Sequence, residues 1–204
     1  MEKKSIRKIV ITGGPCSGKS VGMQALKMHY RQLGYKVLVV PEIASEMIPG
    51  GADLKTCGSA AVFQGLLFGL QLATEKVFEK AAAACEAEKV IIFLDRGTMD
   101  NKAYLTEEEF QQLLLAHKTD ESALMAAYDA VIHLQTLAKF DPEAYERKKG
   151  GNPARGETAE EAIALDDRLI AAWSGHPNFR VVTFGREFKD KLANLTAEIS
   201  SCLK

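Results

Sequence analysis

Cysteine is scarce in this sequence and never clustered. The 204 residues contain four cysteines, at positions 16, 57, 85 and 202, without a Cys-x-x-Cys pair or a neighbouring pair of histidines. Zinc sites and disulfide frameworks both need closely spaced partners, so the pattern argues against either of them. Scattered thiols are typical of a reducing compartment, and we expect a cytoplasmic protein.

Long apolar runs and an excess of charge are also missing. The net charge is −1, and no basic cluster marks a surface for nucleic acid or an anionic membrane. The basic N-terminus is followed by an apolar run of strand length only, which predicts no signal peptide. The most apolar later stretch, residues 60–73, contains Gln64 and Gln71 and is too short to span a bilayer. We therefore expect neither a nucleic-acid partner nor a membrane span.

A glycine-rich motif is the most informative stretch of the chain. It fits Gly-x4-Gly-Lys-Ser/Thr without a departure, after a β-branched run at 6–12 and before an amphipathic stretch at 18–33. Backbone N–H groups of such a loop surround a β-phosphate, the lysine bridges the β- and γ-phosphates, and the hydroxyl ligates Mg²⁺. The nucleotide-binding residues predicted here are Gly13, Gly14, Pro15, Cys16, Ser17, Gly18, Lys19 and Ser20.

Strand-like and helix-like stretches alternate along the whole chain. Apolar runs predict strands at 6–12, 35–40, 90–95, 130–134 and 179–184, and the stretches between them read as helices. This alternation predicts a parallel sheet covered on both faces. We expect a single domain over residues 1–204 of the α/β class, with a three-layer P-loop NTPase fold and a five-stranded parallel sheet in the kinase-like order 2-3-1-4-5.

Residues suited to phosphate chemistry follow the second and third predicted strands. The carboxyl ends of parallel strands meet at one edge of a sheet, where ligands bind. Asp95 can hold Mg²⁺ together with Ser20, and Arg96 can neutralise a transferring phosphate. Glu42 can accept the proton of a substrate hydroxyl. A strand-end ion pair for Asp95 and Arg96, or a helix N-terminal acid for Glu42, is the plainer alternative.

A long helix is predicted at 59–88, with an apolar stripe that we expect to be buried. The stripe consists of Phe63, Leu66, Leu67, Leu70, Ala73 and Val77. Gln64 lies near this stripe, where an amide can read a base edge or a sugar. We therefore predict Gln64 and Glu42 as acceptor-binding residues. The alternative for Gln64 is the ordinary polar flank of an amphipathic helix.

A basic segment with several glycines follows the fourth predicted strand, at about 137–157. Closing such a segment over a phosphate site would bring an arginine onto the γ-phosphate and exclude water. We predict a mobile lid at 137–157 and prefer Arg155 as its catalytic arginine, because a helix follows it. A solvated surface loop is the alternative.

Short motifs occur in a characteristic order along nearly the whole chain. They are Ile11-Thr12-Gly13-Gly14-Pro15-Cys16-Ser17-Gly18-Lys19-Ser20, Val40-Pro41-Glu42-Ile43-Ala44, Phe63-Gln64, Asp95-Arg96-Gly97-Thr98-Met99-Asp100, Tyr128-Asp129, Arg155-Gly156-Glu157 and Trp173-Ser174-Gly175-His176-Pro177. Together they resemble the AAA-domain family typified by the TRPL translocation defect protein and related to the kinase part of the nicotinamide-nucleotide regulator. The resemblance implies a P-loop nucleotide-binding protein with a nucleoside-kinase-like core.

Two functions are compatible with these motifs. We favour an enzyme, a P-loop kinase or NTPase, and specifically an Mg²⁺-dependent phosphotransferase that moves phosphate from ATP (or GTP) to a small hydroxyl-bearing acceptor. Its catalytic residues would be Lys19, Glu42, Asp95, Arg96 and Arg155, with the metal on Ser20 and Asp95. The alternative is an ATP/GTP-binding regulatory module with slow NTPase activity and no acceptor. A GTPase is disfavoured, because residues 101–104 lack the aspartate of the guanine-reading Asn-Lys-x-Asp motif. The oligomeric state is left open.

Overall fold

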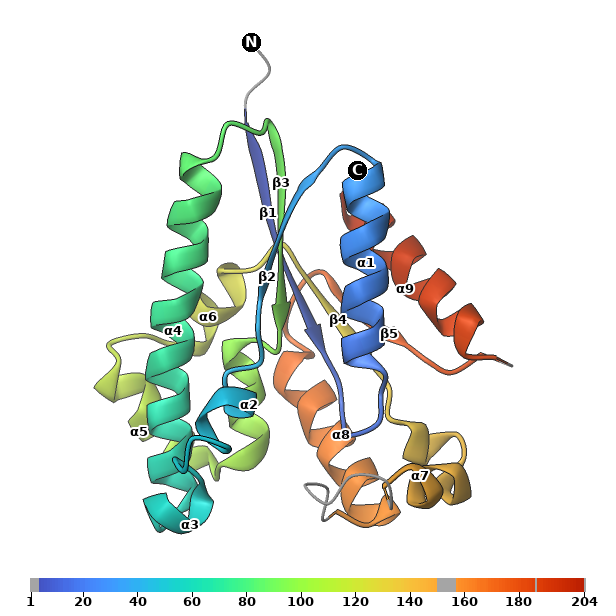
Figure 1. Cartoon of the computed structure of the whole chain (residues 1–204). Helices are drawn as coiled ribbons and strands as arrows, with labels where there is room; N and C mark the ends of the chain where they lie inside the picture. Colours follow the sequence, from blue (N-terminus) through green and yellow to red (C-terminus); the bar gives the residue numbers. More distant parts are fainter. Residues whose placement is uncertain (1–3, 150–156, 186, 204) are drawn as a thin grey trace.

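A parallel five-stranded sheet forms the centre of the chain (Figure 1). The computed structural model describes residues 4–149, 157–185 and 187–203. The strands are β1 (Ser5–Thr12), β2 (Lys36–Val40), β3 (Lys89–Asp95), β4 (Ala130–Leu134) and β5 (Phe179–Val182), in the order β2-β3-β1-β4-β5. The predicted α/β class and the strand order 2-3-1-4-5 are confirmed. Since Ile11 pairs with Asp95 and Thr12 with His133, the strand ends meet at one edge of the sheet.

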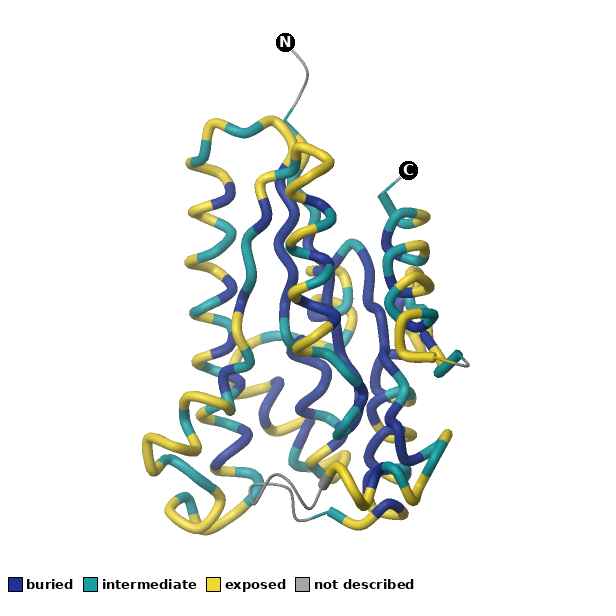
Figure 2. The backbone as a smooth tube through the Cα atoms, turned by 45° about the vertical axis from the view of Figure 1, so that its right-hand side comes forward, coloured by how far each residue is buried: buried dark blue, intermediate teal, exposed yellow. Residues whose placement is uncertain are grey.

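Helices cover both faces of the sheet. Helices α1 (Lys19–Gln32) and α9 (Phe188–Cys202) lie together on one face, and α4 (Ala60–Ala84), α5 (Glu107–Ala116), α6 (Glu121–Ala126) and α8 (Ala159–Trp173) lie on the other (Figure 1). Side chains alternate along a strand, so Ile9 and Ile11 pack towards α1 and α9 while Val10 packs towards α4 and α8. Figure 2 shows the resulting burial, with the central strands largely dark blue.

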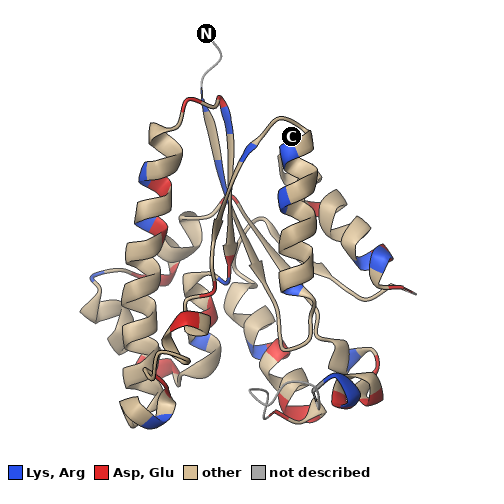
Figure 3. Cartoon of the chain, viewed as in Figure 1, with Lys and Arg blue, Asp and Glu red and all other residues tan. Residues whose placement is uncertain are grey.

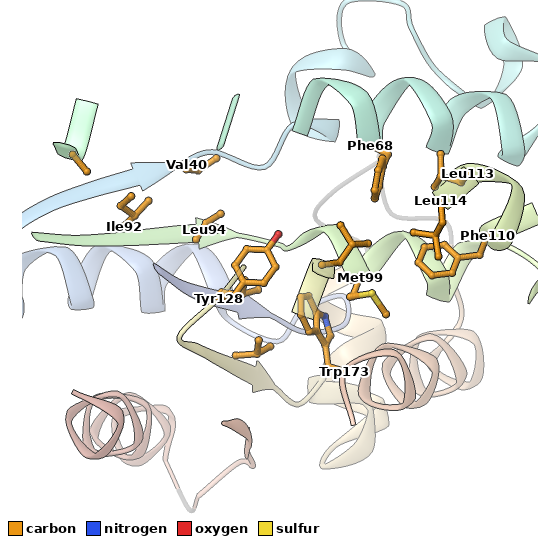
Figure 4. Close-up of a cluster of buried hydrophobic side chains, with 14 of the residues drawn as sticks. Val40, Phe68, Ile92, Leu94, Met99, Phe110, Leu113, Leu114, Tyr128 and Trp173 are labelled. Carbon is orange, nitrogen blue, oxygen red and sulfur yellow. The ribbon is translucent and has the colours of Figure 1, made fainter. Parts of the chain in front are cut away.

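The larger core cluster packs between the sheet and α4, α5 and α8 (Figure 4). Phe68, Met99 and Trp173 are completely buried in it, and the rings of Tyr128 and Trp173 meet edge-on with centroids 5.6 Å apart. Each fully buried side chain of this size stabilises the fold by about 2–3 kcal/mol. This cluster holds α4 and α8 against the sheet, and both helices carry polar residues that reach the candidate site.

Short elements gather where the strands end. They are α2 (Ala44–Met47), α3 (Leu54–Cys57), the 3₁₀ helices η1 (Thr98–Tyr104) and η2 (Leu137–Lys139), and α7 (Pro142–Lys149). Figure 1 shows α2, α3 and α7 near the end of the sheet to which the strand arrows point. They surround the edge at which phosphate chemistry was predicted.

The described part of the predicted lid is helical and not a loop. Residues 137–139 form η2 and residues 142–149 form α7, which is anchored by the fully buried Tyr145. Arg155 and the three glycines at 150, 151 and 156 lie outside the described residues. Movement of the segment therefore stays a prediction, and it concerns a helical element.

Helix α4 is oriented differently from the prediction. Its buried face consists of Phe63, Gln64, Phe68, Gln71, Glu75 and Ala82. Of the stripe expected to be buried, Leu66, Leu70 and Val77 are instead 54%, 46% and 62% exposed. The reason is that polar residues of α4 have partners in the protein interior. Glu75, for example, forms an ion pair with Lys8 of β1 at 3.1 Å. The helix therefore buries amides and a carboxylate and exposes leucines.

None of the helices in the described ranges is both long enough and apolar enough to cross a membrane.

Candidate functional site

The glycine-rich motif forms the loop between β1 and α1. Gly13, Cys16 and Gly18 have φ angles of 143°, 54° and 89°, which wind the backbone into a tight turn before the helix. A side chain at Gly13 would place its Cβ 2.1 Å from the carbonyl oxygen of Leu134, so only glycine fits there. The sequence thus builds an anion-binding loop at the N-terminus of a 14-residue helix.

Lys19 folds back into this loop. Its Nζ donates to the carbonyl oxygens of Gly13 at 2.8 Å and Gly14 at 3.3 Å, and lies 3.4 Å from the Ser17 hydroxyl. Burial and the positive charge of Arg96 lower the pKa of Lys19 to about 8. An anion in the loop would restore the ordinary pKa, so the ammonium is poised to donate to a phosphate oxygen.

A buried carboxylate on α8 holds the phosphate loop by accepting hydrogen bonds from its backbone. Oδ1 of Asp166, on α8, accepts the backbone N–H groups of Gly14 at 3.1 Å and Thr136 at 3.0 Å, and lies 3.0 Å from His133 Nε2. Oδ2 lies 2.9 Å from the Nζ of Lys139. Burial alone would raise the pKa of Asp166, but the hydrogen bonds and charges of His133 and Lys139 outweigh it and lower the pKa.

A buried lysine supports the loop from the other side. Nζ of Lys191, on α9, donates to the carbonyl oxygens of Ser17 at 2.9 Å and Gln135 at 2.6 Å, and lies 3.6 Å from the centroid of the Phe184 ring. The residue is only 1% exposed, and burial lowers its pKa to about 7. Neither Lys191 nor Asp166 was predicted as a site residue. Both occupy apolar-face positions of their helices, a signal that could have identified them.

Asp95 ends β3 with one oxygen unsatisfied. Its Oδ1 is buried and has no hydrogen-bond partner among the described residues, and burial raises the pKa of the carboxyl group. Such an oxygen suits an incoming cation, as predicted for a Mg²⁺ site with Ser20, which is exposed. The described residues form no group of three or more His, Cys, Asp and Glu side chains fit to hold a metal. Mg²⁺ usually keeps several water ligands and binds through one or two protein groups together with phosphate oxygens, so Ser20 and Asp95 would suffice from the protein.

Arg96 links Glu42, a predicted acceptor-side acid, to Asp100, which was not predicted as a site residue. Its backbone has a φ of 74°, which is rare for a residue with a side chain. Nε donates to Glu42 Oε1 at 2.5 Å, and Nη1 donates to Asp100 Oδ2 at 3.3 Å. Burial would raise the pKa of Glu42, but Arg96 and the Ser45 hydroxyl, which donates to Oε2 at 2.6 Å, lower it to about 2. The positive φ angle of Arg96 is a form of backbone strain that is often found at functional positions.

Asp100 is fixed in turn by two further donors. The Thr12 hydroxyl donates to Oδ2 at 2.7 Å, and the Trp173 indole N–H donates to Oδ1 at 2.5 Å. Asp100 is nearly completely buried, at 3% exposed. The guanidinium of Arg96 is thus held by an acid on η1 that is itself fixed by Thr12 at the end of β1 and by Trp173 on α8.

A cavity of about 290 Å³ opens between α2, α4 and the end of β3. Four of the predicted site residues line it: Glu42, Gln64, Asp95 and Arg96. Ile43, Phe63 and Tyr104 supply apolar walls. The structure therefore brings the acceptor-side residues together. Arg155 lies outside the described residues, although Glu157, shortly after it, also lines the cavity.

Two side-chain amides that line this cavity have oxygens without a hydrogen-bond partner among the described residues. Gln64 and Asn101 line it, and within the described structure Gln64 Oε1 and Asn101 Oδ1 are buried without a hydrogen-bond partner. The orientation of Asn101 is fixed, because its Nδ2 donates to Gln71 Oε1 at 3.1 Å and to the Thr98 carbonyl at 2.8 Å. A buried acceptor without a donor costs about 1–3 kcal/mol, so these oxygens suit a ligand that brings N–H or O–H groups.

Comparison with known proteins places this geometry in a family. Residues 8–187 match a family model described as an AAA domain, which covers the phosphate loop, the cavity and α8, and ends at the residue before α9. A comparison with curated proteins gives no match. The matched range, the phosphate loop and the parallel sheet are those of a P-loop protein that binds nucleotides. The chain belongs to the AAA domain family.

Proposed function

We propose that the protein is an Mg²⁺-dependent phosphotransferase that uses ATP and acts on a small hydroxyl-bearing acceptor, in the manner of nucleoside and nucleotide kinases. The observation that carries this proposal is the cavity of about 290 Å³ beside the phosphate loop. Hydrolysis needs room for one water molecule, which takes up roughly 30 Å³ in the liquid. A space this large, lined by acids, an arginine and amides, fits a second substrate.

The phosphate loop would bind the donor. Its backbone N–H groups and the Lys19 ammonium would bind the β- and γ-phosphates, replacing the contacts of Lys19 with Gly13 and Gly14. The Ser20 hydroxyl and the unpaired Oδ1 of Asp95 would hold the metal. A bound Mg²⁺ supplies neutralising charge for the developing transition state.

Glu42 would hold the acceptor hydroxyl in line with the γ-phosphate. A pKa of about 2 makes Glu42 a weak base towards a free hydroxyl. In a loose transition state, however, the hydroxyl becomes strongly acidic only as its oxygen bonds to phosphorus, and a weak base then suffices. Arg96 lies at 2.5 Å from Glu42 and can stabilise the transferring group from the same place.

The acceptor would be recognised through the amides. Gln64 and Asn101 offer buried oxygens, while Phe63 and Tyr104 offer apolar and aromatic surface. This combination suits a nucleoside-like compound with N–H or O–H donors on a flat ring. The narrower resemblance to the kinase part of the nicotinamide-nucleotide regulator supports the same class.

One observation favours the second candidate, a regulatory module that binds ATP or GTP and hydrolyses it slowly. Both oxygens of Glu42 are occupied, Oε1 by Arg96 and Oε2 by Ser45. A carboxylate with satisfied oxygens can serve as a structural brace without contacting an acceptor. In that case the cavity would remain without a phosphate acceptor.

The test is transfer from labelled ATP to a panel of nucleosides, vitamins and sugars. We expect transfer to at least one acceptor, and Glu42→Gln should reduce the rate by roughly 10²–10³-fold while ATP affinity changes little. Glu46→Gln is the matched control, because Glu46 is exposed on α2, which begins two residues after Glu42. Tight ATP or GTP binding without transfer across the panel would refute the kinase proposal and favour the module.

The lid belongs to the same proposal. Arg155 would contact the γ-phosphate when the segment 137–157 closes, so Arg155→Gln should lower the rate of transfer with little change in ATP affinity. Arg147→Gln is the control, since the Arg147 side chain on α7 is 68% exposed. Equal rates for both variants would remove Arg155 from the catalytic set.

A further inference from the structure

The outward face of α4 is apolar along most of the helix. Val62, Leu66, Leu70 and Val77 are 51%, 54%, 46% and 62% exposed, and they recur at spacings that place them on one side. Ala73, Ala81 and Ala84 are also exposed on this face, and the exposed Lys80 lies in line with Val62, about five turns further along the helix. The four larger side chains leave roughly 350 Å² of apolar surface exposed, a size that commonly marks an interaction site.

Charge is confined to one half of this helix. Residues 60–74 contain no charged side chain, whereas Lys76 and Lys80 are exposed in the C-terminal half and the side chain of Glu79 is 42% exposed there. Figure 3 shows the charged colours of α4 in this half. Two such helices packed in parallel would bring each lysine close to its own copy, which is repulsive. An antiparallel pair places the lysines of each copy beside the uncharged half of the other.

Side-chain size is graded in the same way. Three of the four large residues, Val62, Leu66 and Leu70, lie in the N-terminal half. The C-terminal half carries Ala73, Ala81 and Ala84, with Val77 as its one large apolar member. In an antiparallel pair centred between residues 71 and 72, position 70 faces 73, position 66 faces 77, and position 62 faces 81. Large side chains then meet smaller ones, which permits close packing.

We propose that this face pairs with the same face of a second copy of the chain, so that two α4 helices form an antiparallel, two-fold symmetric dimer interface. A two-fold interface requires a surface that is complementary to itself, and the gradients of size and charge both meet that requirement. With the flanking residues of both copies, the contact would bury on the order of 1,000 Å² in total, close to the lower limit for a stable interface. The dimer is therefore reversible and depends on concentration.

This dimer would also support the candidate cavity. The inner face of α4 carries Gln64, which lines the cavity, and Gln71, which orients Asn101. Holding the outer face against a second copy would fix the position of the helix on both sides. The proposal rests on the outer face alone and is independent of whether the protein transfers phosphate.

Sedimentation at a series of concentrations tests the pairing. We expect the mass to rise towards twice that of the monomer, and Leu70→Glu to abolish the rise, because position 70 lies near the two-fold axis. Met28→Glu is the control, since Met28 is 64% exposed on α1, across the sheet. Circular dichroism and a thermal melt would establish that both variants are folded. A wild-type chain that stays monomeric at the highest concentration reached would overturn the proposal.

A size exchange tests the antiparallel register. Leu70→Ala and Ala73→Leu should each weaken the dimer, the first by leaving a gap and the second by crowding, and the double variant should restore it, because each large residue again faces a small one. Failure of the double variant to restore association would overturn this register. Neutral lipid vesicles form a separate arm. Binding of a monomeric wild-type chain to them, lost in Leu70→Glu, would assign the face to a membrane surface and overturn the dimer.

Discussion

The carboxylate of Asp166 accepts the backbone N–H of Gly14 at 3.1 Å, across 152 residues of sequence. The same oxygen accepts the N–H of Thr136 at 3.0 Å, so one atom joins the phosphate loop to the segment after β4. Asp166 is completely buried, and its charge is balanced by Lys139, whose Nζ is 2.9 Å from Oδ2. A single anion on α8 therefore holds the loop in shape before any phosphate binds.

Asp166→Asn should destabilise the fold, because it removes the charge that these donors need. Removing one partner of a buried ion pair costs about 3–5 kcal/mol, and the retained amide oxygen should limit the loss of unfolding free energy to about 2–4 kcal/mol. Urea denaturation measures it. Asp167→Asn is the control: Asp167 also pairs with Lys139, but its side chain is 65% exposed, so the change should be under about 0.5 kcal/mol. Equal losses for the two variants would contradict the role of Asp166.

Lys191→Met should weaken both stability and nucleotide binding. The carbonyl oxygens of Ser17 and Gln135 would lose their buried donor, and each unsatisfied acceptor costs about 1–3 kcal/mol. Thermal unfolding and ADP titration measure the two effects. Lys189→Met removes a lysine that is 75% exposed two residues earlier and should change neither. Loss of stability with unchanged ADP affinity would show that α9 supports the fold without shaping the loop.

Nucleotide affinity should fall as pH rises through about 8. In the free protein the pKa of Lys19 is lowered to about 8, and a bound triphosphate raises it, so binding takes up a proton above this pH. The affinity is then full below pH 8 and decreases towards pH 9 and beyond. Calorimetry at pH 8.5 in buffers of different ionisation enthalpy would detect the uptake. Lys19→Arg keeps a permanent charge and should show no such uptake, and uptake that persists in this variant would assign the proton elsewhere.

Asp95→Asn should stabilise the free protein and remove the effect of Mg²⁺ on nucleotide binding. Burial, with the negative charges of Glu42 and Asp100, raises the pKa of Asp95 against the opposing charges of Lys19 and Arg96, so ionising this carboxyl group costs more here than in water. Relieving this should raise the unfolding free energy by about 1 kcal/mol, as seen for other strained functional sites. Thermal melts with and without Mg²⁺ and ADP measure both effects. A destabilised variant that still responds to Mg²⁺ would contradict the assignment.

The strands could be predicted from the sequence because each apolar run has the length of a strand and lies between stretches with helical periodicity. The rule that parallel strands end at one edge also placed Glu42 and Asp95 on the same side, and both line one cavity. The face of α4 could not be predicted by the same reasoning. Periodicity assigns apolar residues to the buried face of a helix. It cannot detect that Glu75 forms an ion pair with Lys8 on β1, which allows the carboxylate to be buried.

The supports of the loop were missed for a related reason. Asp166 and Lys191 are polar residues at apolar positions of their helices, and their partners are backbone atoms far along the chain. Backbone partners leave no mark in the sequence. Only the position of a charged residue on a buried face indicates that a partner must exist, and the three-dimensional fold identifies it.

The distance along the chain between the phosphate loop and its supports has a consequence for biosynthesis. Gly14 is held by α8, 152 residues later, and Ser17 is held by α9, 174 residues later. A ribosome that has released the motif and the first four strands has not yet released α8, β5 or α9. The nascent chain therefore carries the nucleotide-binding motif long before the two helices that hold the loop have left the ribosome.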